Sequence, residues 1–151
     1  MARTSLEPSR DPADYAFTHR LRTRFAETDA MGVVHHAAYL PYLEEARVEY
    51  LRAIGHPYDA VRGGDEGEAR EFPVLEVSVQ YLKPLHFDDE VGVMLRVGAV
   101  RGATFQIAYL LEVDGRARAT AVTVHGCVDG HGRPARLPGW VAETAAIADR
   151  A

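Results

Sequence analysis

The chain has 151 residues, of which 47% are hydrophobic and 26% are charged, and its formal net charge is −5. This length and composition predict one globular domain, and the acidic balance excludes the broad basic face that sequence-independent nucleic-acid binding requires. No apolar run approaches the roughly 20 residues that span a bilayer, so no membrane span is predicted. The single cysteine, Cys127, and an N-terminus without the apolar core of a signal peptide predict a cytoplasmic protein.

The first half of the chain predicts a leader, a strand and a long helix. Residues 1–14 have no periodicity and predict a mobile leader, which leaves 15–151 as the single domain. Alternation over 16–25 predicts a strand with one buried face, made of Phe17, His19, Leu21, Thr23 and Phe25. A helix over 38–54 follows, because apolar residues recur there at helical spacing: Tyr39, Tyr42, Leu43, Ala46, Tyr50, Ala53 and Ile54.

The second half predicts four more strands. Apolar and polar residues alternate over 75–81, 91–99, 105–113 and 117–128, with a hairpin turn at Asp114-Gly115 and a short surface helix over 139–150. Short links between strands favour an antiparallel meander, so the predicted fold class is α+β, with a long central helix wrapped by a five-stranded antiparallel sheet. The open edges of such a sheet favour pairing of two copies.

The segment Glu27–His36 carries the most chemical information. It places a carboxylate at Asp29, a glycine at Gly32 and two imidazoles directly before the predicted helix. The start of a helix presents unpaired N–H groups and the positive end of its dipole, which can hold a carbonyl oxygen while a carboxylate acts on the carbon. This combination suggests acyl chemistry.

Each residue of this segment also has a purely structural interpretation. Asp29 could act as a general base or a nucleophile, or it could only stabilise the turn that enters the helix. His36 could offer its backbone N–H to an oxyanion, with its ring orienting water or Asp29, or it could only pack locally. His35 is open between structure and function. Adjacent histidines on a turn seldom converge on a metal, so no metal site and no cofactor are predicted.

Two blocks of sequence resemble the acyl-CoA thioesterases of the hotdog fold, in particular the 4-hydroxybenzoyl-CoA thioesterase branch and the Tol–Pal-associated thioesterases. The first is Asp29-Ala30-Met31-Gly32-Val33-Val34-His35-His36-Ala37-Ala38-Tyr39-Leu40, with Glu44 and Ala46-Arg47 following. The second runs from Phe72-Pro73-Val74 through Tyr81-Leu82-Lys83-Pro84-Leu85-His86-Phe87-Asp88-Asp89. The resemblance covers about Phe17 to Pro138, and its first block is the more specific one.

The resemblance implies a helix enfolded by the sheet, dimers joined edge to edge, active sites at the dimer interface, and dimers that pair into tetramers. It implies that Asp29 is the catalytic carboxylate and that the His36 N–H polarises the thioester carbonyl. The residues expected to bind the substrate are Gly32, Val34, His35, Tyr39 and Lys83. Two positions depart from the family, since relatives often carry Asn or Ser where this chain has Ala38, and Tyr or Asn where it has His35.

Other residues compete for these roles. A second hotdog lineage carries its catalytic acid on the central helix, which makes Glu44 or Glu45 an alternative base, although both fit a solvated or ion-paired helix face. Lys83, Arg96 and Arg101 are candidates for a coenzyme A phosphate, and Cys127 is expected to be inert.

The sequence therefore predicts an acyl-CoA thioesterase that releases a carboxylic acid and coenzyme A, with an acyl-CoA as its small-molecule partner. Two alternatives remain open. One is hydrolysis of an acyl-carrier-protein thioester, which needs a basic rim for an acidic carrier. The other is a hotdog protein that binds acyl-CoA without cleaving it, for which a reactive carboxylate would be unnecessary.

Overall fold

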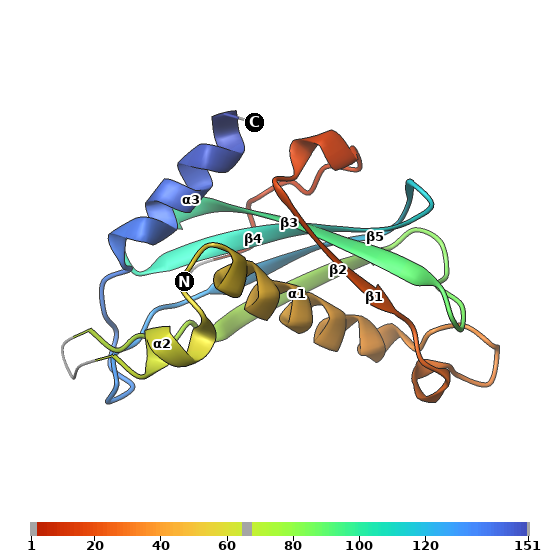
Figure 1. Ribbon diagram of the computed structural model, residues 1–151, viewed down its shortest axis with the longest axis horizontal. Coiled ribbons are helices and arrows are strands. Elements are labelled where there is room, and N and C mark those ends of the chain that lie inside the picture. The colour runs from red at the N-terminus through yellow and green to blue at the C-terminus, as the bar shows by residue number, and fades with distance from the viewer. Residues whose placement is uncertain (1–2, 65–67, 151) are drawn as a thin grey trace.

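The chain forms an antiparallel sheet with a long helix, α1, across one face, as the computed structural model describes for residues 3–64 and 68–150 (Figure 1). The five strands lie in the order β1-β3-β4-β5-β2 and comprise β1 (Phe17–Arg22), β2 (Val74–Tyr81), β3 (Glu90–Arg101), β4 (Thr104–Val113) and β5 (Arg116–His125). The helices are α1 (Tyr39–Ala53), α2 (Tyr58–Arg62) and α3 (Gly139–Arg150). Three 3-10 turns precede α1: η1 (Pro12–Asp14), η2 (Phe25–Glu27) and η3 (His36–Ala38). The predicted α+β fold with its five-stranded antiparallel sheet is confirmed, but the predicted meander holds only for β3, β4 and β5, because β2 pairs with β5 at the edge far from β1.

One face of α1 packs on the sheet to form the main core. Its buried residues are those that helical spacing predicts, namely Tyr39, Tyr42, Leu43, Ala46 and Tyr50. They pack in one cluster with the inward residues of β3, Val91, Val93, Leu95 and Val97, none of which is more than 3% exposed. Burying a side chain of this size contributes about 1.5–3 kcal/mol, so this contact holds the helix on the sheet. Ala53 was expected on the same face, but it is exposed because it lies in the last turn.

The first strand is shorter than its alternation predicts. β1 ends at Arg22, and the chain then enters the 3-10 turn η2. Phe25, expected on the buried face, is therefore 76% exposed and packs edge to face on Phe87, with ring centroids 5.7 Å apart. The prediction for Phe25 is wrong because a strand period does not continue through a turn.

The N-terminal segment contacts the face of the sheet that is opposite α1. The backbone N–H groups of Ser5 and Leu6 donate to the Gln106 side chain at 2.9 and 3.0 Å. Tyr15 packs on Ala108 and Leu110 of β4, both fully buried. The sequence predicts a mobile leader over 1–14, and the division of the chain at residue 15 stays a prediction, but residues 3–14 make specific contacts in the structure.

Strands β1 and β2 form the two edges of the sheet, and β2 exposes apolar side chains. Leu75 is 54% exposed, Val77 40% and Tyr81 48%. A long apolar edge strand is a template for pairing with another strand, and monomeric proteins normally protect such an edge.

Candidate active site

The turn from Asp29 to Val33 uses one oxygen of the Asp29 carboxylate and leaves the other available. Oδ1 of Asp29 accepts hydrogen bonds from the backbone N–H groups of Met31 at 2.8 Å and Val33 at 3.4 Å. The Gly32 N–H donates to the Asp29 carbonyl at 3.0 Å, and Gly32 has a φ of 80°, which glycine adopts without strain. Among the residues that the structure describes, none donates to Oδ2 of Asp29. The carboxylate is thus oriented while one oxygen can meet a ligand.

The same turn occurs a second time, from Asp129 to Arg133. Oδ1 of Asp129 accepts from the N–H groups of His131 at 2.8 Å and Arg133 at 3.0 Å, and Gly132 has a φ of 76°. The backbone donors, first that of Arg133, hold the pKa of Asp129 below its usual range. An aspartate in this turn therefore stabilises the loop whatever else it does. The turn alone does not assign catalysis to Asp29, and Asp129 provides a matched control.

The two histidines begin the helical segment that leads into α1. Nδ1 of His35 accepts a hydrogen bond from the Ala37 N–H at 3.0 Å, and the rings of His35 and His36 stack with centroids 4.1 Å apart. Within the described part of the chain, the His36 N–H has no hydrogen-bond acceptor, whereas its carbonyl accepts from the Tyr81 hydroxyl at 2.8 Å. The His36 peptide is thus held by its oxygen, and its N–H is left for a ligand.

Asp29 and His36 line the same surface hollow, which has a volume of about 300 Å³. Five of the seven predicted site residues line it: Asp29, Val34, His36, Tyr39 and Lys83. Gly32 and His35 are neighbours of these residues in the chain but do not line the hollow. Sequence reasoning missed Tyr81, which closes the hollow from the end of β2 and packs edge to face on Tyr39 at 4.9 Å. The alternation over 75–81 predicted the strand that ends at Tyr81, but it carried no sign of the contact with His36.

A hydrogen bond from Tyr42 attaches the Asp29 turn to the side of α1. The Tyr42 hydroxyl donates to Oε1 of Glu27 at 2.6 Å, and the Glu27 carbonyl accepts from the His35 N–H at 2.7 Å. Burial opposes ionisation of Glu27, but the hydrogen bonds from Tyr42 and Arg24 outweigh it and hold the pKa of Glu27 below its ordinary value. Glu27 therefore joins the turn, the helix start and α1.

Replacing Tyr42 by phenylalanine is expected to lower the free energy of unfolding by about 1.5–3 kcal/mol, the usual contribution of a hydrogen bond to a charged group. Urea unfolding measures this change. The control is Tyr58→Phe, because Tyr58 is 43% exposed, and its variant should stay within about 0.5 kcal/mol of the parent protein. Equal unfolding free energies for the two variants would show that the Tyr42–Glu27 bond does not stabilise the turn.

The two glutamates that compete with Asp29 lie elsewhere on α1. Glu45 pairs with His19 of β1, with 2.7 Å between Oε2 and the ring Nε2. Glu44 is exposed and lines a different cavity. The structure describes no ion pair between Glu44 and Arg47, although their spacing allows one. Neither glutamate lines the hollow that holds Asp29, which favours Asp29 as the acid of this site within one protomer.

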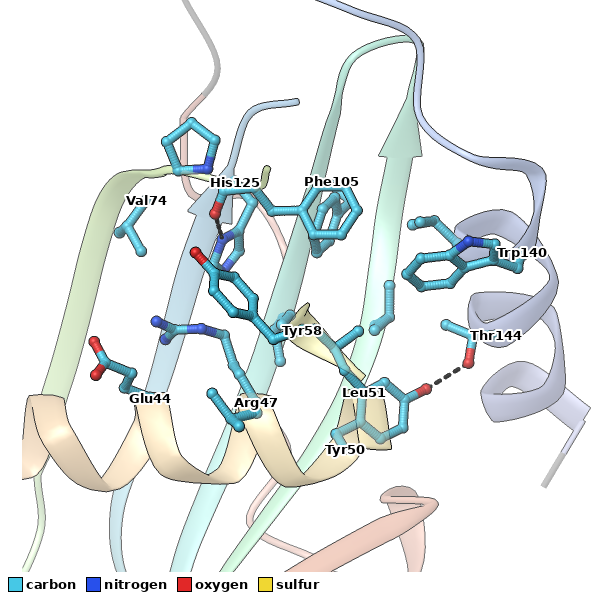
Figure 2. A pocket seen from close by; sticks show the side chains of 16 residues that line it. Glu44, Arg47, Tyr50, Leu51, Tyr58, Val74, Phe105, His125, Trp140 and Thr144 are labelled. Carbon is cyan, nitrogen blue, oxygen red and sulfur yellow. Dashed lines mark hydrogen bonds between the residues drawn. The ribbon is translucent and has the colours of Figure 1, made fainter. Parts of the chain in front are cut away.

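A second and more enclosed cavity, of about 390 Å³, lies between α1, α3 and the sheet (Figure 2). Its floor contains His125, which is 1% exposed and stacks on Phe105 with centroids 5.0 Å apart. The His125 ring hydrogen-bonds Thr123 at 2.8 Å and the Phe72 carbonyl at 3.2 Å. Burial, assisted by the positive charge of Arg47, lowers the pKa of His125 to about 4. This histidine is therefore neutral near pH 7.

The lowered pKa of His125 predicts that acid destabilises the protein. Between pH 7 and 5, an unfolded His125 with its pKa near 6.5 takes up a proton, whereas the folded one does not. Because only the unfolded state binds this proton, His125 lowers the free energy of unfolding by about 2 kcal/mol as the pH falls from 7 to 5. Urea unfolding of His125→Gln should show a pH dependence flatter by that amount. Identical pH slopes for the variant and the parent would contradict a neutral, buried His125.

The three residues that the sequence offers for binding a coenzyme A phosphate, Lys83, Arg96 and Arg101, lie in different parts of the structure. Lys83 is exposed at the rim of the Asp29 hollow, where a phosphate could reach it. Arg96 pairs in register with Ala108, whose side chain lies on the face opposite α1, and Arg101 ends β3 at the far hairpin. Neither lines the hollow. Cys127 is 3% exposed, and burial raises the pKa of its thiol, which makes the thiolate scarce.

Within residues 3–64 and 68–150, which the structure describes, no helix is long and apolar enough to cross a membrane. In the same two ranges, no group of three or more histidine, cysteine, aspartate or glutamate side chains is placed to hold a metal ion.

Comparison with known proteins identifies the family. Residues 23–145 match the model of the thioesterase-like superfamily. The chain is 32% identical over 126 residues to an acyl-CoA thioesterase, YbgC, of Haemophilus influenzae, with 83% of this chain and 90% of that protein aligned. It is 30% identical over 138 residues to the 1,4-dihydroxy-2-naphthoyl-CoA hydrolase of Synechococcus elongatus, covering 88% of this chain and 98% of the other.

A solved structure agrees with this assignment. A hypothetical protein from Aquifex aeolicus superposes with a TM-score of 0.78 at 38% identity, over 86% of this chain and 99% of that one. The chain belongs to the thioesterase-like superfamily and has the hotdog fold, so the predicted family and fold are both confirmed. It is a thioester hydrolase by class.

Proposed function

We propose that this protein hydrolyses acyl-CoA thioesters to a carboxylic acid and free coenzyme A, with Asp29 as general base or nucleophile. The single observation that carries the proposal is the pairing of two unsatisfied groups in one hollow: Oδ2 of Asp29 and the backbone N–H of His36. Acyl transfer needs a base or nucleophile for the carbonyl carbon and a donor for the carbonyl oxygen. The names of the aligned thioesterase and hydrolase support the same chemistry.

The reaction follows from these two groups. As a base, Asp29 takes a proton from water while the oxygen of that water attacks the thioester carbon. The carbonyl oxygen becomes an oxyanion, which the His36 N–H and the positive end of the α1 dipole stabilise. The intermediate then collapses, the C–S bond breaks, and the proton held by Asp29 passes to the departing thiolate. As a nucleophile, Asp29 would instead form an anhydride that water cleaves.

The other predicted residues have supporting roles in this proposal. Gly32 and His35 shape the backbone on either side of the attack site, since they set the turn and the start of the helix. Val34 and Tyr39, 4% and 2% exposed, form the apolar wall beside the acyl carbon. The ammonium group of Lys83 at the rim is placed to attract a phosphate of coenzyme A.

A dimer joined through the β2 edges would complete the site. Two copies of one strand that pair about a two-fold axis run antiparallel, so the Tyr81 end of one strand lies beside the partner's Val74. The hollow with Asp29 adjoins Tyr81, and the larger cavity adjoins Val74. Pairing would therefore bring the hollow of one protomer next to the cavity of the other. Association of two such dimers into a tetramer is part of the same proposal.

Release of coenzyme A distinguishes this proposal from its two alternatives. We expect free thiol from a panel of acyl-CoA esters, detected with a thiol-reactive dye, at a rate well above that without protein. Cleavage confined to acyl groups on an acyl carrier protein would favour the carrier-protein thioesterase, which the net charge of −5 does not favour. Tight binding of acyl-CoA without release would instead indicate a non-catalytic binding protein.

We also propose a cytoplasmic location for the protein. The observation behind it is Cys127, which is the single cysteine of the chain and is buried as a free thiol. Proteins that fold in oxidising compartments commonly carry paired cysteines, and this chain has no pair to form.

A further inference from the structure

We infer that the cavity between α1 and α3 is the acyl pocket of the site completed by the partner, and that Arg47 selects acyl groups whose apolar body ends in an oxygen acceptor. This inference rests on the proposed acyl-CoA hydrolysis, because it assigns the part of the substrate that the Asp29 hollow does not accommodate. The oxygen acceptor can be a hydroxyl or a carboxylate, and Arg47 recognises either one by donating hydrogen bonds.

The walls of the cavity are apolar and largely aromatic. Phe105 and Ile107 of β4, Trp140 of α3 and Val48 of α1 line it, together with Phe72, which meets Phe105 and Trp140 edge to face at 5.3 and 5.9 Å. Figure 2 shows Phe105 and Trp140 facing the same space above α1. A volume of about 390 Å³ with such walls suits a compact acyl group and falls in the usual range for small-molecule pockets.

The floor carries a connected chain of polar groups. Nη1 of Arg47 lies 3.4 Å from the hydroxyl of Tyr109, which is 2.8 Å from the hydroxyl of Thr123, which in turn is 2.8 Å from the His125 ring. Tyr109, Thr123 and His125 are each no more than 1% exposed. These three side chains hydrogen-bond one another, and the Tyr109 hydroxyl also accepts one long hydrogen bond from the Arg47 guanidinium.

Arg47 has donors to spare. A guanidinium carries five N–H groups, and the structure describes one long contact for Arg47, to the Tyr109 hydroxyl, with no carboxylate in ion-pair range. A half-buried cation beside apolar walls gains most from a ligand oxygen, since water is partly excluded there. The neighbouring His125 is neutral and does not compete for an anionic group.

The mouth of the cavity faces the edge where the dimer is proposed to form. Pro73 and Val74 at the start of β2 and Glu44 of α1 are exposed and line the cavity. The cavity and the Asp29 hollow share no lining residue within one protomer. A thioester carbon beside Asp29 would therefore send its acyl group into the partner's cavity across the β2 edge, with the distal end over Arg47.

The test compares acyl-CoA pairs that differ by one oxygen: hexanoyl-CoA with 6-hydroxyhexanoyl-CoA, and phenylacetyl-CoA with 4-hydroxyphenylacetyl-CoA. The parent protein should show the higher kcat/KM for the oxygenated member, carried by a lower KM. Arg47→Met should reduce that preference about tenfold or more, the effect of losing a charge-assisted hydrogen bond. Arg47→Lys should restore part of it. The matched control is Arg52→Gln, because Arg52 lies on the same helix but pairs with Glu49 in solvent.

A second readout does not depend on hydrolysis. Trp140 is the single tryptophan of the chain and lines the cavity, so 6-hydroxyhexanoate and 4-hydroxyphenylacetate should change its fluorescence on binding. Arg47→Met should weaken that binding, and Val48→Phe, which fills the cavity, should abolish it. If Arg47→Met hydrolyses both members of each pair with the parent's preference, the inference is overturned while the proposed hydrolysis stands. If no ester is cleaved but the free acids still bind in an Arg47-dependent way, the proposed hydrolysis fails and the pocket assignment stands.

Discussion

Asp29→Asn is expected to lower kcat for acyl-CoA hydrolysis at least about 100-fold, with little change in KM or in the melting temperature. Loss of a general base or of a nucleophile has effects of this size or larger. The fold should survive, because an asparagine side-chain oxygen can still accept the hydrogen bonds that Oδ1 of Asp29 receives from Met31 and Val33. Steady-state kinetics and thermal unfolding of the purified variant measure both parts of this prediction.

Asp129→Asn is the control for that experiment. Asp129 occupies the same turn, with the same pattern of backbone donors and a glycine at positive φ three residues on. Both variants lose one charge from equivalent loops, so any general effect of the substitution on the turn appears in both. We expect Asp129→Asn to keep the parent's kcat. A comparable loss in both variants would reduce Asp29 to a structural residue of its turn.

Val77→Lys is expected to prevent dimer formation and, with it, most of the hydrolysis. Val77 lies in the middle of β2 and is 40% exposed, so lysine costs the isolated protomer little but brings like charges together where two β2 strands would pair. Because the proposed site spans two copies, kcat/KM should fall more than tenfold. Light scattering after gel filtration gives the mass of the assembly, and thiol release gives the activity.

The opposite edge of the sheet provides the control for Val77→Lys. Thr18 is exposed on β1, the other edge strand, and Thr18→Lys adds the same charge there. That variant should remain a dimer with normal activity. A dimeric and active Val77→Lys would rule out the β2 edge as the interface, and a monomeric but fully active parent protein would rule out a shared site.

Local patterns predicted the elements that have a clear period. The helical spacing from Tyr39 to Tyr50 records a single buried face, and the structure confirms it. The alternation along β3 and β4 predicted both strands, but β4 is buried on its two faces because the N-terminal segment covers the face opposite α1. These patterns failed where the backbone changes its geometry. Phe25 continues the alternation of β1 in sequence, but it lies in a turn, so its side chain points to solvent.

Contacts between distant segments left no local signal. The N-terminal segment lies on the sheet because Ser5 and Leu6 find the amide of Gln106 about a hundred residues later, and no periodicity marks such a contact. The hydrogen bond from the Tyr81 hydroxyl to the His36 carbonyl also joins distant segments, and no local pattern predicts it. The large cavity likewise combines residues of α1, β4, β5 and α3, and most of the residues that line it are apolar, as in an ordinary core.

For the candidate site, the sequence singled out the segment from Asp29 to His36, but it could not show which of its polar groups form hydrogen bonds within the protein. The turn explains why Asp29 could be interpreted in two ways, since one oxygen stabilises the loop and the other is available. The histidine pair proved to be divided in role: the His35 ring accepts from the helix start, whereas the His36 backbone N–H is open to a ligand. The catalytic roles of both residues remain part of the proposal.

The ratio of kcat for Asp129→Asn to kcat for Asp29→Asn, measured by thiol release on the best acyl-CoA of the panel, tests the central claim most directly. It compares two identical turns, one beside the open His36 N–H and one remote from it. Asp29-dependent hydrolysis predicts a ratio above about 100. A ratio near one, or a parent protein that releases no coenzyme A, would contradict the assignment of this hollow as the active site.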